Sequence, residues 1–245
     1  MQGLFFDCRY IRIDHHDGIS RFSAGLYAAL AKMTPITAVI NDLRQLEKLP
    51  AGTNFVKISS PTSPLEPFVA LRINQLGAKI FFSPMQTVGS LGRKFKLVLT
   101  VHDLIYYRHP APPPGFSWPI RLMCRLYHMS FLPQRLLLNR VDAIATVSNT
   151  TKELIAKHKL TIKPVSVIYN APEADPELAT GANGDFQAPR HRPAPENQER
   201  QSLVYMGSFM DYKNVEVLIR GMAELPGYEL DLLSRISPSR QEQLK

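Results

Sequence analysis

The sequence predicts an α/β fold, in which a mostly parallel, doubly wound sheet carries helices on both faces. Two observations predict it. Short apolar runs bounded by polar residues recur along the chain, and segments with the apolar spacing of helices alternate with them. The composition agrees, because 44% of the 245 residues are hydrophobic and 20% are charged, as in a globular protein with a large core.

The elements of the first domain can be placed in order. Residues 3–8, GLFFDC, predict the first strand, and residues 20–33, SRFSAGLYAALAKM, predict a helix because their apolar residues recur at helical spacing. A second helix is predicted for TTKELIAKH, residues 150–158. Further strands are expected at residues 36–40, 54–59, 78–84, 96–103, 142–148 and 164–170. We expect residues 1–170 to form one domain.

The pattern is interrupted and then restarts. Residues 171–201 are rich in Pro, Gly and charge, and we interpret them as a linker or surface excursion. Residues 202–245 then predict a strand, an amphipathic helix and a strand, the opening β-α-β of a second domain of the same kind. A complete second domain would need about 100 further residues. We therefore expect this domain to be either vestigial or continued in a longer gene product.

The charge of the chain indicates an anionic partner. The formal net charge is +8, which would attract phospholipid head groups, a phosphorylated substrate or nucleic acid. Cys8 and Cys124 have no metal-ligand or redox spacing, so we expect reduced thiols and a cytoplasmic location. No window approaches the roughly 18 uncharged apolar residues of a membrane span.

Residues 118–140 are basic and apolar, with four arginines and no acid. Two interpretations stay open. The segment could lie on an anionic membrane surface, at the inner face of the membrane. Alternatively, it forms a pair of core-facing helices with a solvated basic edge, divided at Pro133.

Ligands of open α/β sheets bind at the carboxyl ends of the strands, so the polar residues there are the candidate site. In DHHDGIS, residues 14–20, Gly18 permits close backbone approach before a helix N-terminus, which favours anions. The alternative is a simple turn in which Asp17 or Ser20 caps the helix.

His102 and Asp103 follow the apolar run in VHDLIYYRHP, residues 101–110, which we expect to continue as a proline-rich loop. Imidazole offers a donor and an acceptor near neutral pH, so His102 could orient a sugar hydroxyl or contact a phosphate, with Asp103 orienting it. The alternative is that Asp103 caps the strand end and His102 is a satisfied polar residue.

Two further strand ends carry polar residues. In VSNTTKEL, residues 147–154, helix capping by Ser148 or Asn149 is a sufficient explanation. In GSFMDYKN, residues 207–214, Lys213 precedes a helix, where a cation is unfavourable for the helix dipole unless an anion binds there. An exposed lysine is the alternative.

Several familiar motifs are absent from the sequence. It contains no G-x-x-x-x-G-K-[ST] phosphate loop, no H-E-x-x-H, no clustered Cys/His metal site and no G-x-S-x-G elbow. The sequence therefore favours chemistry that needs no cofactor, no bound metal and no protein nucleophile of a familiar type.

Taken in order, these segments resemble the GT-B glycosyltransferases of family 4, especially the bacterial mannosyltransferase-like branch that builds polysaccharides and glycolipids. DGISRF is similar to the branch's GIGRY loop, and VHDLIYYRHP is similar to its T-x-H-D-L-I-P-x-x-x-P segment. The remaining similar segments are FFSP at 81–84, ATVSNTTKELI at 145–155, VIYNAP at 167–172 and YMGSFMDYKNVEVLIRGM at 205–222.

The resemblance implies a retaining hexosyltransferase, mannose-like in specificity, that uses a nucleotide-diphosphate sugar and a glycan or lipid-linked acceptor. The reaction would take place between two Rossmann-like domains without a required metal, with the acceptor on the N-terminal domain and the donor on the C-terminal one. No nucleic-acid partner is implied.

The resemblance also assigns roles to residues of this sequence. His102, with Asp103, would sit beside the transferred sugar as the catalytic pair. Lys213 would neutralise the charge that develops on the departing nucleotide. The donor diphosphate would be approached by Gly18, Ile19, Lys213 and Asn214, and the acceptor side of the cleft would include Ser148 and Asn170.

The sequence departs from the family at three places. Tyr212 stands where the family has Arg, Ala171 stands where it has Gly, and the family's E-x7-E segment would lie beyond residue 245. We therefore expect residues 1–245 alone to be inactive or incomplete as an enzyme. The alternative function is a non-catalytic basic module that binds an anionic glycan, lipid or nucleic acid.

Overall fold

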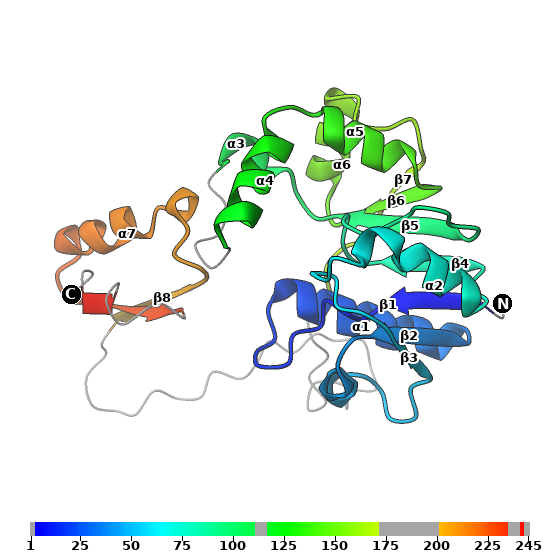
Figure 1. Cartoon of the computed structure of the whole chain (residues 1–245). Helices are drawn as coiled ribbons and strands as arrows, with labels where there is room; N and C mark the ends of the chain where they lie inside the picture. Colours follow the sequence, from blue (N-terminus) through cyan, green and yellow to red (C-terminus); the bar gives the residue numbers. More distant parts are fainter. Residues whose placement is uncertain (1–2, 111–116, 172–200, 235–240, 243–245) are drawn as a thin grey trace. The chain divides into compact units, whose positions relative to one another are not determined.

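The computed structural model describes residues 3–110, 117–171, 201–234 and 241–242. The chain divides into two compact units, of which the first holds the described residues up to Ala171 and the second holds those from Gln201 onward. Figure 1 labels their helices and strands, and each unit is described by itself below.

The first unit contains a seven-stranded sheet in the order β3-β2-β1-β4-β5-β6-β7. Every neighbouring pair of strands in it is parallel. The predicted doubly wound parallel sheet is therefore confirmed. The order in which strands are added reverses between β1 and β4, because β2 and β3 extend the sheet on one side of β1 and β4 to β7 extend it on the other. The strands are β1 (Leu4–Asp7), β2 (Ile36–Ile40), β3 (Phe55–Lys57), β4 (Ile80–Ser83), β5 (Lys96–Val101), β6 (Ala143–Thr146) and β7 (Val165–Val167).

Six α-helices and two 3-10 segments accompany this sheet among the described residues. The break predicted at Pro133 is present, because this proline lies in the first turn of α5, where its missing N–H costs nothing. The loop expected after Asp103 is instead partly helical, as α3. The helices are α1 (Gly18–Met33), α2 (Val69–Gln75), α3 (Ile105–Arg108), α4 (Trp118–His128), α5 (Leu132–Asn139) and α6 (Asn149–Lys157), with η1 (Leu43–Lys48) and η2 (Glu66–Phe68).

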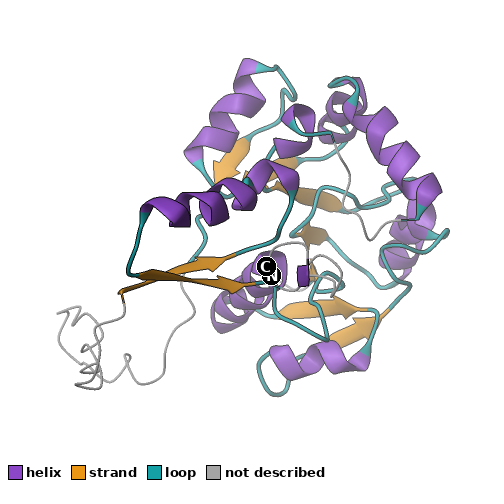
Figure 2. Ribbon diagram, turned by 90° about the vertical axis from the view of Figure 1, so that its left-hand side faces the viewer, coloured by secondary structure: helices purple, strands orange, loops and turns teal. Residues whose placement is uncertain are grey.

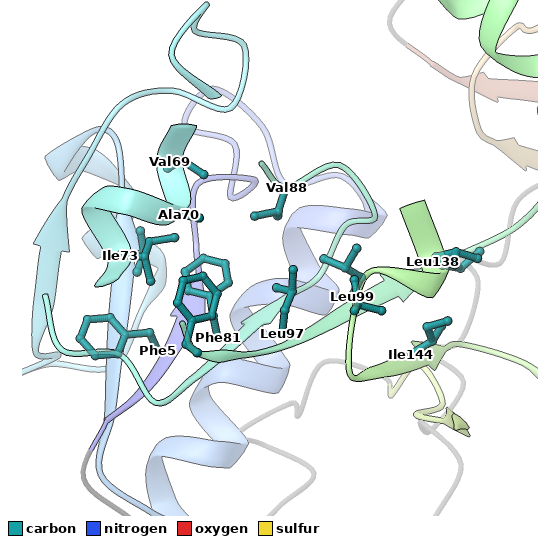
Figure 3. Close-up of a cluster of buried hydrophobic side chains, with 14 of the residues drawn as sticks. Phe5, Val69, Ala70, Ile73, Phe81, Val88, Leu97, Leu99, Leu138 and Ile144 are labelled. Atoms are coloured by element: carbon teal, nitrogen blue, oxygen red, sulfur yellow. The ribbon is translucent and has the colours of Figure 1, made fainter. Parts of the chain in front are cut away.

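Hydrophobic cores lie on both faces of the sheet because successive strand residues point to opposite sides. Phe5 and its neighbours pack against α2, α5 and α6 on one face, where Figure 3 shows the cluster around Phe81, Leu97 and Leu99. Phe6 belongs to the other core, which α1 covers, and its ring stacks on that of Phe82 with 5.1 Å between centroids.

A buried ionic cluster fixes the loop between β1 and α1. The Arg9 guanidinium contacts Asp7 at 2.8 Å and Glu66 at 2.7 Å, and the arginine side chain is fully buried. Its Nη1 also donates to the backbone oxygen of Ser59 at 3.1 Å. Gln45 Nε2 donates to the carbonyl oxygens of Arg9 and Ile11, so the backbone of the loop is held as well.

The second unit is a β-α-β motif. Strands β8 (Gln201–Met206) and β9 (Tyr228–Leu233) pair in parallel along their whole length, and α7 (Val215–Gly221) connects them, flanked by η3 (Asp211–Lys213) and η4 (Met222–Glu224). Figure 2 shows these elements by type. The strand, helix and strand predicted within residues 202–245 are present as this motif.

Among the described residues, no helix has both the length and the apolar character needed to cross a bilayer.

Candidate functional site

His102 lies at the carboxyl edge of the sheet, directly after β5. Its Nε2–H donates to the carbonyl oxygen of Pro84, which follows β4, at 2.8 Å. The Phe22 ring of α1 meets the imidazole edge-on, with 5.1 Å between centroids, and Thr151 Oγ1 donates to the His102 backbone oxygen at 3.1 Å. Three other segments singled out in the sequence therefore contact this histidine.

The surroundings of His102 keep its ring neutral. Burial lowers the pKa of His102 below its ordinary value of 6.5, against smaller raising effects from the Pro84 carbonyl and the Asp103 charge. Because the Pro84 oxygen can only accept a hydrogen bond, the ring proton belongs on Nε2. This leaves Nδ1 as an acceptor.

A first prediction concerns this titration. Since the folded pKa lies below the unfolded one, the stability contributed by the neutral ring is present above pH 6.5 and is lost as the pH falls through the lowered pKa. NMR titration of the His102 ring should give a midpoint below 6.5, and Phe22→Ala, which opens one side of the ring, should raise it. A midpoint at or above 6.5 in the unmodified chain would contradict this account of the site.

A small pocket opens beside the histidine. Its volume is about 120 Å³, and His102, Asp103 and Ile19 line it. Asp103 Oδ1 accepts a hydrogen bond from the backbone N–H of Ile105 at 3.0 Å, so Asp103 also performs the capping role that was its simpler interpretation. The remaining lining residues are Met85, Gln86, Thr100, Leu104, Tyr106, Tyr107 and His128.

Tyr107 of α3 is a site residue that sequence reasoning missed. Its hydroxyl is buried and has no hydrogen-bond partner among the described residues. Its ring packs against that of Phe131, with 4.1 Å between the ring centroids. Burial raises the pKa of Tyr107 to about 12, so the group stays protonated at neutral pH. A buried hydroxyl without a partner is costly, and a ligand hydroxyl in the pocket would satisfy it.

This assignment predicts a difference between two tyrosines. Tyr107→Phe should not lower the free energy of unfolding, because it removes an unsatisfied hydroxyl, yet it should weaken ligand binding. Tyr127→Phe is the matched control, since the Tyr127 hydroxyl donates to Gln134 at 2.6 Å, and it should lose about 0.5–1.5 kcal/mol. Urea unfolding measures both, and equal losses would show that the Tyr107 hydroxyl is structurally bound.

The residues of the loop DHHDGIS, 14–20, have different roles in the structure. Gly18 is the first residue of α1, and Asp17 caps the helix by accepting from Ser20 N–H at 2.8 Å. A Cβ on Gly18 would meet no described atom within 4 Å, so the protein's own packing does not require glycine there. The open space is what close approach of a ligand needs. Ile19 lines the same pocket as His102.

Ser148 and Asn170 lie outside this pocket. Ser148 caps α6 by accepting from Thr151 N–H at 3.1 Å, which is the simpler of its two interpretations. Asn170 is exposed after β7. Neither is among the described residues that line the pocket of His102.

Lys213 and Asn214 belong to the second unit. Lys213 is exposed, with its Nζ 5.5 Å from the ring centroid of Tyr212, the residue that replaces the family's arginine. Asn214 adopts a left-handed conformation, φ 52°, and precedes α7. Glu216 supplies a negative charge in the first turn of this helix and contacts Arg220 at 3.4 Å. A role in diphosphate binding stays a prediction for both residues.

A larger cavity, of about 660 Å³, lies along α1, and its lining includes Arg21, Lys32, Lys48 and Tyr169. Its described lining combines three cationic side chains with aromatic, aliphatic and small residues, and it includes no acid. We place the candidate site at the smaller pocket because the imidazole, the unpaired tyrosine hydroxyl and the strand ends meet there. Among the described residues, no group of three or more His, Cys, Asp or Glu side chains is placed to hold a metal ion.

The comparison with protein families matches residues 17–175 to the model described as Glycosyltransferase Family 4. This range includes α1, the Ser-Pro end of β4, His102 and Asp103, and α6. No curated protein sequence matches the chain. The family match therefore covers the first unit from residue 17 onward, a range that includes every residue lining the pocket.

Proposed function

Because the chain belongs to glycosyltransferase family 4, we propose that it transfers a hexose, mannose-like in specificity, with retention of anomeric configuration. The donor is a nucleotide-diphosphate sugar, and the acceptor is a hydroxyl group of a glycan or a lipid-linked saccharide. The alternative of a non-catalytic basic module is less favoured, because the family match includes the residues that form the pocket.

One observation carries the proposal: His102 lines a pocket at the carboxyl edge of the sheet, with its Nε2 bonded to the Pro84 carbonyl oxygen. Its free Nδ1 is suited to accept a hydrogen bond from a sugar hydroxyl, and the Tyr107 hydroxyl is available as a second partner. Polar groups that are already oriented in the folded protein need little rearrangement to stabilise the charge that develops in the transition state. We assign the contact with the transferred sugar to His102, and we place Asp103 beside the same sugar as the second member of the catalytic pair.

The donor diphosphate requires positive charge. We assign this charge to Lys213, with Asn214 beside it. For the first unit taken by itself, we propose that the open backbone at Gly18, with Ile19 next to it, leaves room for a phosphate group. A lysine can stabilise a departing nucleotide without a metal ion.

The test is a transfer assay on the native protein with mannose and glucose nucleotides and a lipid-linked saccharide acceptor. Mass spectrometry should detect one added hexose that depends on the donor, and NMR of the product should show the donor's anomeric configuration. Chelators should leave the rate unchanged. No hexose added with any donor, or an inverted product, would contradict the proposal.

A further inference from the structure

Helix α4 packs on the protein through one narrow side. The His128 ring contacts those of Tyr106 and Tyr107, with 5.5 and 5.0 Å between centroids, and the Tyr127 hydroxyl donates to Gln134. No residue of α4 is fully buried. The rest of the helix surface is left without a protein partner among the described residues.

This surface is strongly apolar. Trp118 is 75% exposed, and Met129, which follows the helix, is 78% exposed. Exposed apolar groups of this size on a folded protein usually mark an interaction site. The other exposed apolar residues of α4 and the first turns of α5 are Ile120, Leu122, Met123, Leu126, Leu132 and Leu136. We call the surface formed by these residues the α4 face.

The charge of the α4 face is positive. Arg121 and Arg125 are exposed, and neither guanidinium has an ion-pair or hydrogen-bond partner within the described part of the chain. Together with Trp118 and Leu122 they line a shallow cavity of about 240 Å³. Residues 118–140 contain no acid. A complementary partner must therefore combine negative charge with a hydrocarbon surface.

We propose that the α4 face lies on an anionic phospholipid bilayer. The aliphatic side chains and Trp118 would enter the boundary between head groups and acyl chains, while Arg121 and Arg125 contact lipid phosphates. Nucleic acid fits less well, because it would need several stacking aromatic residues, and Trp118 is the one exposed aromatic residue of α4. The inference goes beyond the proposed transferase activity and does not depend on it.

The chain carries its own probe for this binding, because Trp118 is its single tryptophan. Vesicles of phosphatidylcholine containing phosphatidylglycerol should shift the tryptophan emission to the blue and co-sediment the protein, and added salt should weaken both effects. Pure phosphatidylcholine vesicles should have a much smaller effect. Emission that is already blue without vesicles and does not change with them would overturn the proposal.

Matched variants separate the α4 face from overall charge. Arg121→Gln with Arg125→Gln should weaken binding about thirty-fold, from about five-fold per arginine. Lys152→Gln with Lys157→Gln removes the same charge from exposed positions on α6 and should have a clearly smaller effect. Equal losses in the two variants, or binding to an RNA oligonucleotide but not to vesicles, would also overturn the proposal.

Discussion

Replacing Arg9 with alanine is expected to destabilise the first unit by about 3–5 kcal/mol. The Arg9 and Asp7 side chains are fully buried and that of Glu66 is 12% exposed, so the variant would leave two carboxylates without their cation in a nearly dry environment. It would also remove the hydrogen bond to Ser59 that ties the β1 loop to the chain after β3. Urea unfolding followed by circular dichroism measures the loss.

The loss should depend on pH. Burial raises the pKa of Glu66, and the hydrogen bond and charge of Arg9 oppose this rise. Without Arg9 the pKa of Glu66 in the folded protein would rise further. A carboxyl group whose pKa is higher in the folded state than in the unfolded state makes the folded protein less stable as the pH rises through that folded pKa. The destabilisation by Arg9→Ala should therefore be largest at neutral pH and shrink as the pH falls.

Arg44→Ala is the control for this prediction. Arg44 contacts Asp42 at 2.7 Å, but both groups are solvated at the surface, where ion pairs contribute little. We expect this variant to unfold almost as the unmodified chain does. If Arg9→Ala lost no more stability than Arg44→Ala, the buried cluster would not be what holds the loop.

The sheet could be predicted because its inner strands, β1, β2, β4, β5 and β6, are largely buried on both faces. Such strands appear in the sequence as continuous apolar runs, and ITAVI at β2 (Ile36–Ile40) has the same limits in the sequence and in the structure. Helix α2 (Val69–Gln75) was not predicted, because seven residues after a proline-rich segment are too few to show a helical period. The order of the strands depends on tertiary packing, which periodicity does not encode.

The site could be predicted in part for a similar reason. His102 was identified because it follows a strand end, and parallel strands bring their carboxyl ends to one edge. Ile19 was named through the resemblance of DGISRF to the family's loop. Tyr107 was missed because its importance comes from an unpaired hydroxyl, which depends on the packing of α3 and not on any local pattern. Lys213 and Asn214 belong to the second unit, and their shared role with His102 rests on the resemblance to the family.

Replacing His102 with alanine is expected to lower sugar transfer by the native protein by about 10²–10³, the range found for removal of one preplaced polar group at a reacting centre. The loss in melting temperature should be small by comparison, because the ring is only partly buried and makes one hydrogen bond within the described part of the chain, to Pro84. Steady-state transfer rates and thermal unfolding on the same preparations give the two quantities.

Two polar replacements separate the roles of the two ring nitrogens. In His102→Gln the amide nitrogen can take the place of Nε2 and keep the bond to Pro84, but nothing replaces the Nδ1 acceptor. In His102→Asn the side-chain oxygen can take the place of Nδ1, while the bond to Pro84 is lost. If Nδ1 contacts the sugar, asparagine should retain more activity and glutamine more stability. If glutamine restored both, His102 would act only by holding the Pro84 loop, and the sugar contact would have to be assigned to another residue of the pocket.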